Sequence, residues 1–295
     1  MVKTFINYPS YSLPQELMQI LKKYSYIFNP SLILHNGVGY LSIRVYEDKS
    51  ETILGLIFVW DDAGNIEQLN LSRYFEDNEG IHKVADPKLF IMNNKVYGTF
   101  NTGDAIKDFN HLVLFQLEKS RIFDYKFCGY NERYRTEKNW AFFIDEEELY
   151  ALYNLSPLTI LKAIKTDENY IEFEKCFYDK TQSLKNYSIG TQLVKVKGKF
   201  CFIAHKKLYR KRKRLYLGRI CILFLKDSPK IAVKKSFLIH SWKSLFGSKF
   251  KFNKNLISCS YFSGLSLDRE NIIVGYGIND VDWNIVTLKQ KELWL

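Results

Sequence analysis

Residues 29–44 read NPSLILHNGVGYLSIR: a hydrophobic run, a polar two-residue turn, and a second hydrophobic run that ends on a polar residue. Four further stretches repeat this pattern. They are DPKLFIMNNKVYGTFN from Asp86, NWAFFIDEEELYALYN from Asn139, GTQLVKVKGKFCFIAH from Gly190 and FSGLSLDRENIIVGYG from Phe262. Two hydrophobic runs around a short polar turn are typical of a β-hairpin, so the sequence predicts five hairpins.

The hairpins recur at a nearly regular spacing. Their last residues are Arg44, Asn101, Asn154, His205 and Gly277, which lie 57, 53, 51 and 72 residues apart. A period of about 50 residues, in which each repeat is a hairpin plus further strands, is the mark of a propeller blade. We therefore expect an all-β fold, a five-bladed β-propeller over residues 29–295, with residues 1–28 as an N-terminal extension that caps it.

Stretches rich in Ile, Leu, Phe and Tyr fill the intervals between the hairpins and predict the outer strands of the blades. They are residues 51–71, 111–128, 159–177, 215–233 and 284–295. A short helix is expected within residues 14–26, because PQELMQILKKYSY places apolar residues at helical spacing. Helix signals are nearly absent beyond it.

Charge and cysteine content limit the classes of partner. The chain has 43 Lys and Arg against 32 Asp and Glu, a formal net charge of +11 that favours anionic partners such as phosphates, nucleotides, acidic glycans or lipid headgroups. Nothing resembles a nucleic-acid-binding module, so no nucleic-acid partner is expected. The five cysteines are scattered without a CxxC pair, which argues against a disulfide framework and against a metal site.

The hydropathy pattern bears on location. No stretch of about 18 apolar residues occurs, so no transmembrane segment is expected. The beginning MVKTFINYPSYSLPQEL lacks the apolar segment and small-residue cleavage site of a signal peptide. These features predict a cytoplasmic protein and leave its oligomeric state open.

Polar residues end the second strand of four hairpins. In a hairpin the start of the first strand and the end of the second lie side by side, at the rim opposite the turn. The approximate rotational symmetry of a propeller then brings Arg44, Asn101, Asn154 and His205 into a ring around the axis. A polar ring at a pocket mouth is the expected form of a small-ligand site. The alternative is that these are ordinary polar residues where strands run into solvated loops.

Several stretches carry recognisable motifs: ADPKLF with NKVYGTFNTGD (85–104), TEKNWAFF (136–143), GKFCFIAH (198–205), RLYLGRICILFLKDSPKIAVKKS (214–236) and SYFSGLSLDRENIIVGYGIND (260–280). In this order they resemble motifs of the β-mannoside phosphorylase and hydrolase family, a carbohydrate-active group of five-bladed propellers. The similarity spans roughly residues 29–285. It implies an enzyme that acts on a glycosidic bond of an oligosaccharide or glycan.

The resemblance also implies roles for single residues. Asp104 stands where the family keeps its catalytic acid, the proton donor to the departing glycosidic oxygen; an inverting phosphorylase uses incoming phosphate in place of a second carboxylate and water. The expected substrate-binding residues are Arg44, Asp86, Asn101, Asn154 and Asp280. The expected phosphate-binding residues are Lys88, Lys138 and His205. No metal or other cofactor is implied, and inorganic phosphate is the co-substrate that the resemblance allows.

The sequence departs from the family where anions are bound. Lys88 replaces the arginine after Asp-Pro, Asn154 occupies a strand end where an arginine is expected, and Thr191-Gln192 replaces a proline-rich turn. A glycosyltransferase that uses a nucleotide sugar in surface polysaccharide synthesis is therefore one alternative. A non-catalytic glycan-binding or protein-interaction propeller is another.

Simpler readings of the same residues also stay open. Asp104 could be a loop aspartate in TGDAIKD, and Lys138 and Asp280 could form strand-end ion pairs or turns. The basic run 205–219 holds eight Lys or Arg in fifteen residues. It either binds the phosphates of a donor or another anionic surface, or is a solvated hairpin loop.

Overall fold

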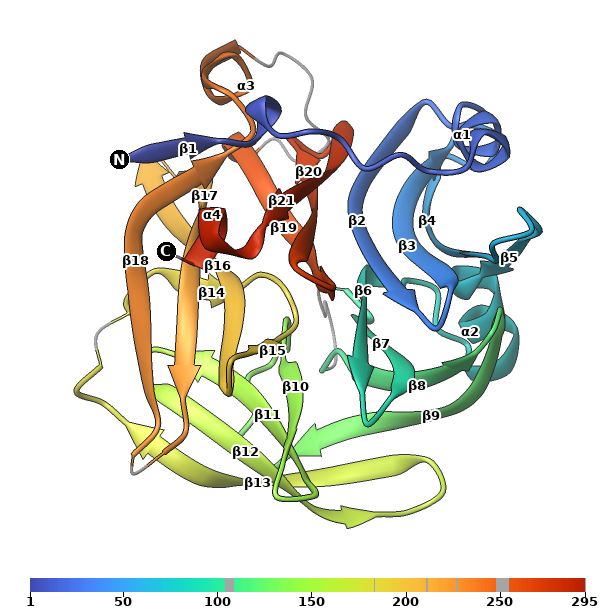
Figure 1. The fold of residues 1–295 in the computed structure, drawn as a ribbon. Coiled ribbons are helices and arrows are strands. Elements are labelled where there is room, and N and C mark those ends of the chain that lie inside the picture. Colours follow the sequence, from blue (N-terminus) through green and yellow to red (C-terminus); the bar gives the residue numbers. More distant parts are fainter. Residues whose placement is uncertain (104–108, 183, 211, 227, 248–254, 295) are drawn as a thin grey trace.

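A computed structural model describes residues 1–103, 109–182, 184–210, 212–226, 228–247 and 255–294. In this part of the chain the fold is all-β, as expected, and its strands form strongly curled sheets. Figure 1 shows the sheets arranged as a ring, with β2 (Tyr26–His35), β6 (Ala85–Met92) and β10 (Ala141–Asp145) near its centre. The architecture is that of a propeller-like fold.

The strands follow one another as antiparallel meanders. The first sheet runs β2, β3 (Val38–Glu47), β4 (Thr52–Trp60) and β5 (Ile66–Asn70). The second joins β6, β7 (Lys95–Asn101), β8 (Leu112–Glu118) and β9 (Arg121–Tyr130) to β10, β11 (Glu148–Leu155), β12 (Leu158–Thr166) and β13 (Tyr170–Asp179). The two meanders of this sheet meet where the outer strands β9 and β13 pair in parallel.

The third sheet is built in the same way. In it β14 (Tyr187–Ile189) and β15 (Val194–Val196) both pair with β16 (Lys199–Arg210), followed by β17 (Lys213–Phe224) and β18 (Lys230–Ile239). A parallel pairing of β17 adds β19 (Leu256–Asp268), β20 (Asn271–Ile278) and β21 (Asp282–Lys289). Each of the five predicted hairpins is present, so this part of the sequence interpretation is confirmed.

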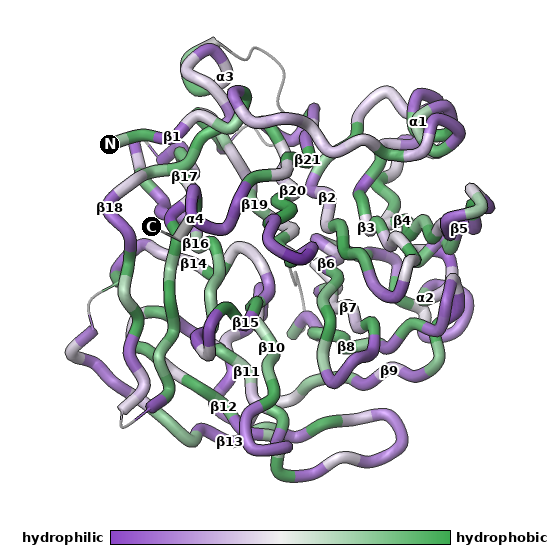
Figure 2. The backbone as a smooth tube through the Cα atoms, viewed as in Figure 1, coloured by the Kyte–Doolittle hydropathy of each residue, from purple (hydrophilic) through white to green (hydrophobic). Residues whose placement is uncertain are grey.

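The turn residues explain why these hairpins form. Both central residues have positive φ in the turns Asn36-Gly37, Asn93-Asn94, Glu146-Glu147 and Lys197-Gly198. That geometry matches the right-handed twist of the flanking strands. Asn and Gly adopt it readily, whereas Glu146 and Glu147 adopt it against their preference. Figure 2 shows hydrophilic turns and hydrophobic strand centres, and the latter pack into buried clusters between neighbouring meanders.

The first and last meanders close the ring through glycines. Gly264 and Gly275 face the backbone of Pro30 and Ser31 so closely that no side chain fits between them. A Cβ on Gly275 would lie 2.3 Å from the carbonyl oxygen of Pro30. This contact brings β19 and β20 against β2, next to Asn29.

Replacing Gly275 by alanine should therefore open this contact. We expect a loss of about 1–3 kcal/mol in the free energy of unfolding, because backbone must move to relieve the overlap. Gly129→Ala is the control, since its Cβ would meet the hydroxyl of Tyr170, an exposed side chain that can swing away. Urea unfolding of both variants measures the difference, and an equal loss in the two would contradict the role of the glycine.

The N-terminal extension contributes to the sheets. β1 (Val2–Thr4) pairs in parallel with β18, and the backbone near residues 9–11 bonds to β21 through Pro9 and Tyr11. The helix α1 (Gln15–Leu21) then buries Leu17 and Leu21 against the first meander. The predicted short helix is present, and the extension joins the outer edges of the last two meanders to the first.

Three further α-helices in the described part of the chain escaped sequence prediction. They are α2 (Leu71–Glu79), α3 (Trp242–Gly247) and α4 (Gln290–Trp294). In α2 the Asn70 side chain accepts a hydrogen bond from the Arg73 N–H and Gly80 ends the helix in a left-handed conformation. These are ordinary helix-capping signals. They were overlooked because the sequence on either side has the composition of strands.

Candidate functional site

Three equivalent positions lie near the beginnings of the inner strands of the first three meanders: Asn29, Asp86 and Asn139. All three have left-handed backbone, with φ of 55°, 51° and 61°. Asn and Asp tolerate this conformation better than other side chains that carry a Cβ. The pairing register shifts at Asn29 and at Asp86, which is the geometry of a β-bulge. The bulges turn these polar side chains toward one another at the end of the axis.

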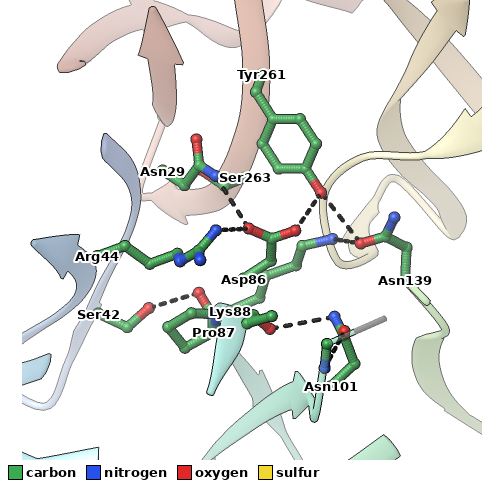
Figure 3. A network of polar contacts seen from close by, with 12 residues as sticks. Asn29, Ser42, Arg44, Asp86, Pro87, Lys88, Asn101, Asn139, Tyr261 and Ser263 are labelled. Atoms are coloured by element: carbon green, nitrogen blue, oxygen red, sulfur yellow. Dashed lines mark hydrogen bonds and ion pairs between the residues drawn. The ribbon is translucent and has the colours of Figure 1, made fainter. Parts of the chain in front are cut away.

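Asp86 is the centre of the resulting network, shown in Figure 3. Its Oδ1 accepts hydrogen bonds from Arg44 Nη1 and Asn29 Nδ2, each at 3.0 Å, and its Oδ2 accepts one from the Tyr261 hydroxyl at 3.1 Å. Burial alone would raise the pKa of Asp86, but Arg44 and Lys88 outweigh it and hold the pKa below its ordinary value. Asp86 is thus a carboxylate held charged inside the protein.

A buried lysine lies next to this carboxylate. Lys88 is 1% exposed, and its Nζ donates to Asn139 Oδ1 at 2.7 Å, while the Tyr261 hydroxyl lies 3.3 Å from the same oxygen. Burial lowers the pKa of Lys88 to about 8, although Asp86 opposes the shift. The Tyr261 phenol has a pKa raised far above its ordinary value, first by burial and then by Asp86. It therefore stays a hydrogen-bond donor.

The network forms one wall of a polar cavity of about 280 Å³. A tight turn between β20 and β21, with positive φ at Asn279 and Asp280, presents the Asp280 carboxyl to this cavity. Burial raises the pKa of Asp280 to about 6, and the charge of Asp86 adds to the rise against the opposing effects of Arg44 and Arg214. The cavity thus contains one ionised carboxylate and one carboxyl that protonates near pH 6.

The predicted site residues divide into four groups. Arg44, Asp86, Lys138 and Asp280 line the cavity. Asn101 and Asn154 do not; Asn101 bonds to the backbone of Ala85 and Gly103, and Asn154 to Leu155 and Ser156. Lys88 and His205 are buried behind the lining, and the predicted acid Asp104 lies outside the described residues.

His205 packs under the cavity wall. Its ring centre lies 4.4 Å from that of Tyr261, and its Nε2 accepts a hydrogen bond from the Phe262 N–H at 2.9 Å. This bond requires a neutral ring with the proton on Nδ1. Burial lowers the pKa of His205 to about 3, with Lys88 and Lys207 adding to the effect. His205 therefore supports Tyr261 from behind.

The buried neutral histidine predicts acid sensitivity. The unfolded chain binds a proton at this position below pH 6.5 and the folded protein only below about 3, so stability falls as pH drops from 6.5. At pH 4.5 the loss from this group should reach about 3 kcal/mol. Urea unfolding at pH 7.5 and 4.5 should show a smaller pH dependence in His205→Gln than in the wild type. The exposed His82 gives the control variant, and an unchanged dependence in His205→Gln would contradict the assignment.

Sequence reasoning missed part of the site. Asn29 and Asn139 were recognised only as the first residues of hairpins, although they are the counterparts of Asp86 in the repeat. Tyr261 was not among the expected site residues. Lys207, Arg214 and Tyr216 also line the cavity. The first two belong to the basic run, and its sequence pattern does not show which of its Lys and Arg side chains point into the cavity.

A larger cavity, of about 450 Å³, lies at the other ends of the inner strands and is mainly apolar, lined among others by Phe90, Phe142 and Leu265. We place the candidate site in the smaller cavity because the ionisable side chains converge there. Among the described residues no group of His, Cys, Asp and Glu is arranged to hold a metal ion. No helix in the described ranges is long and apolar enough to cross a bilayer.

Comparison with known proteins gives a fold and no close relative. No protein-family model matches the sequence, and no curated protein is similar to it in sequence. A glycosyl hydrolase from Bacteroides ovatus has the same fold, with a TM-score of 0.63 and 10% identity over 91% of this chain and 86% of that one.

Two further solved structures bear on the resemblance seen in the sequence. One comes from work on family 130 of mannoside phosphorylases, which contains glycoside hydrolases that target β-1,2-mannosidic linkages in Candida mannan. This structure matches the present chain with a TM-score of 0.63 and 10% identity, over 90% of this chain and 85% of that one. The other is a β-1,2-mannobiose phosphorylase from Listeria innocua bound to β-1,2-mannobiose, with a TM-score of 0.54 and 13% identity over 92% and 91%. The resemblance to the β-mannoside phosphorylase and hydrolase family is confirmed at the level of the fold.

Proposed function

We propose that this protein is a five-bladed propeller enzyme that acts on a glycosidic bond in the polar cavity, as a glycoside phosphorylase or hydrolase. The observation that carries the proposal is the partly buried, ionised Asp86, held by Arg44, Asn29 and Tyr261 at the wall of the cavity. A rigidly held carboxylate suits a sugar in two ways. It accepts hydrogen bonds from hydroxyl groups, and its charge favours the positive charge that develops on the ring as the bond breaks.

Bond cleavage also needs a proton for the departing oxygen. The resemblance assigns this role to Asp104, which follows directly on the strand and turn that end at Gly103. Asp280 would hydrogen-bond the sugar from another side, as donor or acceptor according to its protonation. Phosphorolysis would further require cations for the attacking phosphate, and Lys138 lines the cavity for that purpose.

The test is a product assay with β-1,2-mannobiose, in the presence and absence of inorganic phosphate. Phosphate-dependent release of mannose 1-phosphate would support a phosphorylase, and phosphate-independent release of mannose a hydrolase. Either activity should be lost in Asp104→Asn. Turnover that persists in this variant would remove Asp104 from the mechanism, while no turnover of any glycoside would overturn the proposal.

A second candidate is a glycosyltransferase that uses a nucleotide sugar. The cationic side chains Lys207 and Arg214 on the cavity wall favour it, because they suit the phosphates of an activated donor. Thermal stabilisation by a nucleotide sugar but not by phosphate would support this function. Stability unchanged by either would leave a non-catalytic glycan-binding or interaction role.

A further inference from the structure

One face of the strands β16 and β17 presents two cations to the cavity. Lys207 lies directly opposite Tyr216 in the ladder, and Arg214 is two residues before Tyr216, so all three share a face. Lys207 Nζ lies 5.9 Å and the Arg214 guanidinium 5.8 Å from the centre of the Tyr216 ring. This face lines the cavity. Lys206 points to the other face, where its Nζ bonds to the Lys185 carbonyl.

Backbone contacts hold this face in place. The Lys207 N–H donates to the Asn186 carbonyl at 2.7 Å, and the Arg214 N–H to the Asn255 carbonyl at 2.8 Å. Beyond Arg214, β17 pairs in parallel with β19, and the Tyr216 ring packs on His205 with ring centres 6.0 Å apart. The two cations therefore project from a fixed platform into the cavity.

The charges on this wall are not balanced within the protein. Arg44 is paired with Asp86, whereas in the ranges that the structure covers neither Lys207 nor Arg214 has a carboxylate within ion-pair distance. Burial lowers the pKa of Lys207, and repulsion from Arg214 and Lys138 lowers it further. Like charges held this close together are unfavourable unless an anion joins them.

We propose that the saccharide bound in this cavity carries an anionic group, a phosphate or a carboxylate, that is held by Lys207 and Arg214. The planar fork of Arg214 can bind two oxygens of such a group and Lys207 supplies a point charge beside it. The sugar hydroxyls are left to Asp86 and Asp280. This inference rests on the proposed function, since it names the substrate class of the same site.

Titration calorimetry can test the inference with mannose 6-phosphate, glucuronate, mannose and inorganic phosphate as probes. The wild-type protein should bind at least one of the two anionic sugars at least 10-fold more tightly than mannose and than phosphate alone. Lys207→Met should reduce that preference about 10-fold, the scale of one charge-assisted hydrogen bond, and weaken mannose binding much less. Lys206→Met is the matched control on the other face of the strand and should leave both affinities unchanged.

Three outcomes would overturn the inference: mannose that binds as tightly as both anionic sugars, equal effects of Lys207→Met and Lys206→Met, or inorganic phosphate that binds as tightly as the sugar phosphate. The last would mark these residues as a site for free phosphate.

The same experiments separate this inference from the proposed function. Binding of an anionic sugar that depends on Lys207, without cleavage of any glycoside, would refute the enzyme activity alone. Turnover of neutral mannobiose with no preference for anionic sugars would refute only the inference.

Discussion

Asp86→Asn is expected to reduce saccharide turnover at least about 100-fold, the usual scale for loss of a charge that stabilises a transition state. It should also lower the free energy of unfolding by about 3–5 kcal/mol, because it leaves Arg44 and Lys88 buried without their counter-charge. Product assays and urea unfolding at pH 7.5 measure the two effects. Full activity in a folded Asp86→Asn protein would contradict the role of the carboxylate in the site.

Asp280→Asn provides the contrast within the same cavity. The folded protein binds a proton at Asp280 more tightly than the unfolded chain does, so the ionised group costs stability above pH 6. The stability of this variant relative to the wild type should therefore rise between about pH 4 and pH 6, by up to about 3 kcal/mol. If Asp280→Asn lost as much stability at pH 7.5 as Asp86→Asn, this would contradict the account. It would mean that a favourable ion pair, which the structure does not show, stabilises the ionised Asp280 carboxylate.

Glu137→Ala should destabilise the protein by about 3–5 kcal/mol, since it removes a buried charge and leaves several donors unpaired. Glu137 is 3% exposed, and its carboxylate accepts hydrogen bonds from the Tyr134 N–H, the Tyr153 hydroxyl and Trp140 Nε1 at 2.6–2.8 Å. Its own backbone is bonded at both ends to the Asn110 side chain. The next two residues, Lys138 and Asn139, line the cavity.

The same substitution should weaken saccharide binding, because it frees the segment that positions Lys138 and Asn139. Glu132→Ala is the control, a glutamate of the same segment with a side chain 65% exposed, whose ion pair with Lys175 lies at the surface and should contribute little to stability. Chemical unfolding and calorimetry on the two variants measure both effects. Equal stabilities would contradict the anchoring role of Glu137.

The hairpins were predictable because the residues of each turn determine its backbone conformation locally. Asn36-Gly37 and Lys197-Gly198 determine a reversal whatever surrounds them, and the repeat spacing then indicates a ring. The convergence of Arg44, Asp86 and Asp280 on one cavity followed from that symmetry and from the resemblance. None of these required knowledge of side-chain packing.

The expected site residues that do not line the cavity are those where a local contact competes with the symmetric pattern. Asn101 and Asn154 were placed in the polar ring, but an Asn side chain can bond to its own neighbouring backbone, and both do so. Lys88 was expected to bind phosphate, yet the bulge at Asp86 changes which way the following residues face, and the Lys88 side chain is buried. His205 is covered by Tyr261, a contact between residues far apart in sequence that no spacing reveals.

A crystal structure of the protein soaked with a saccharide that it binds is the most direct test of the central claim. The account predicts a sugar ring in the polar cavity, with hydroxyl groups within hydrogen-bond distance of Asp86 and Asp280 and any anionic substituent next to Lys207 and Arg214. An ordered saccharide in the apolar cavity at the other end of the inner strands, or on the outer surface with the polar cavity free of sugar, would contradict it.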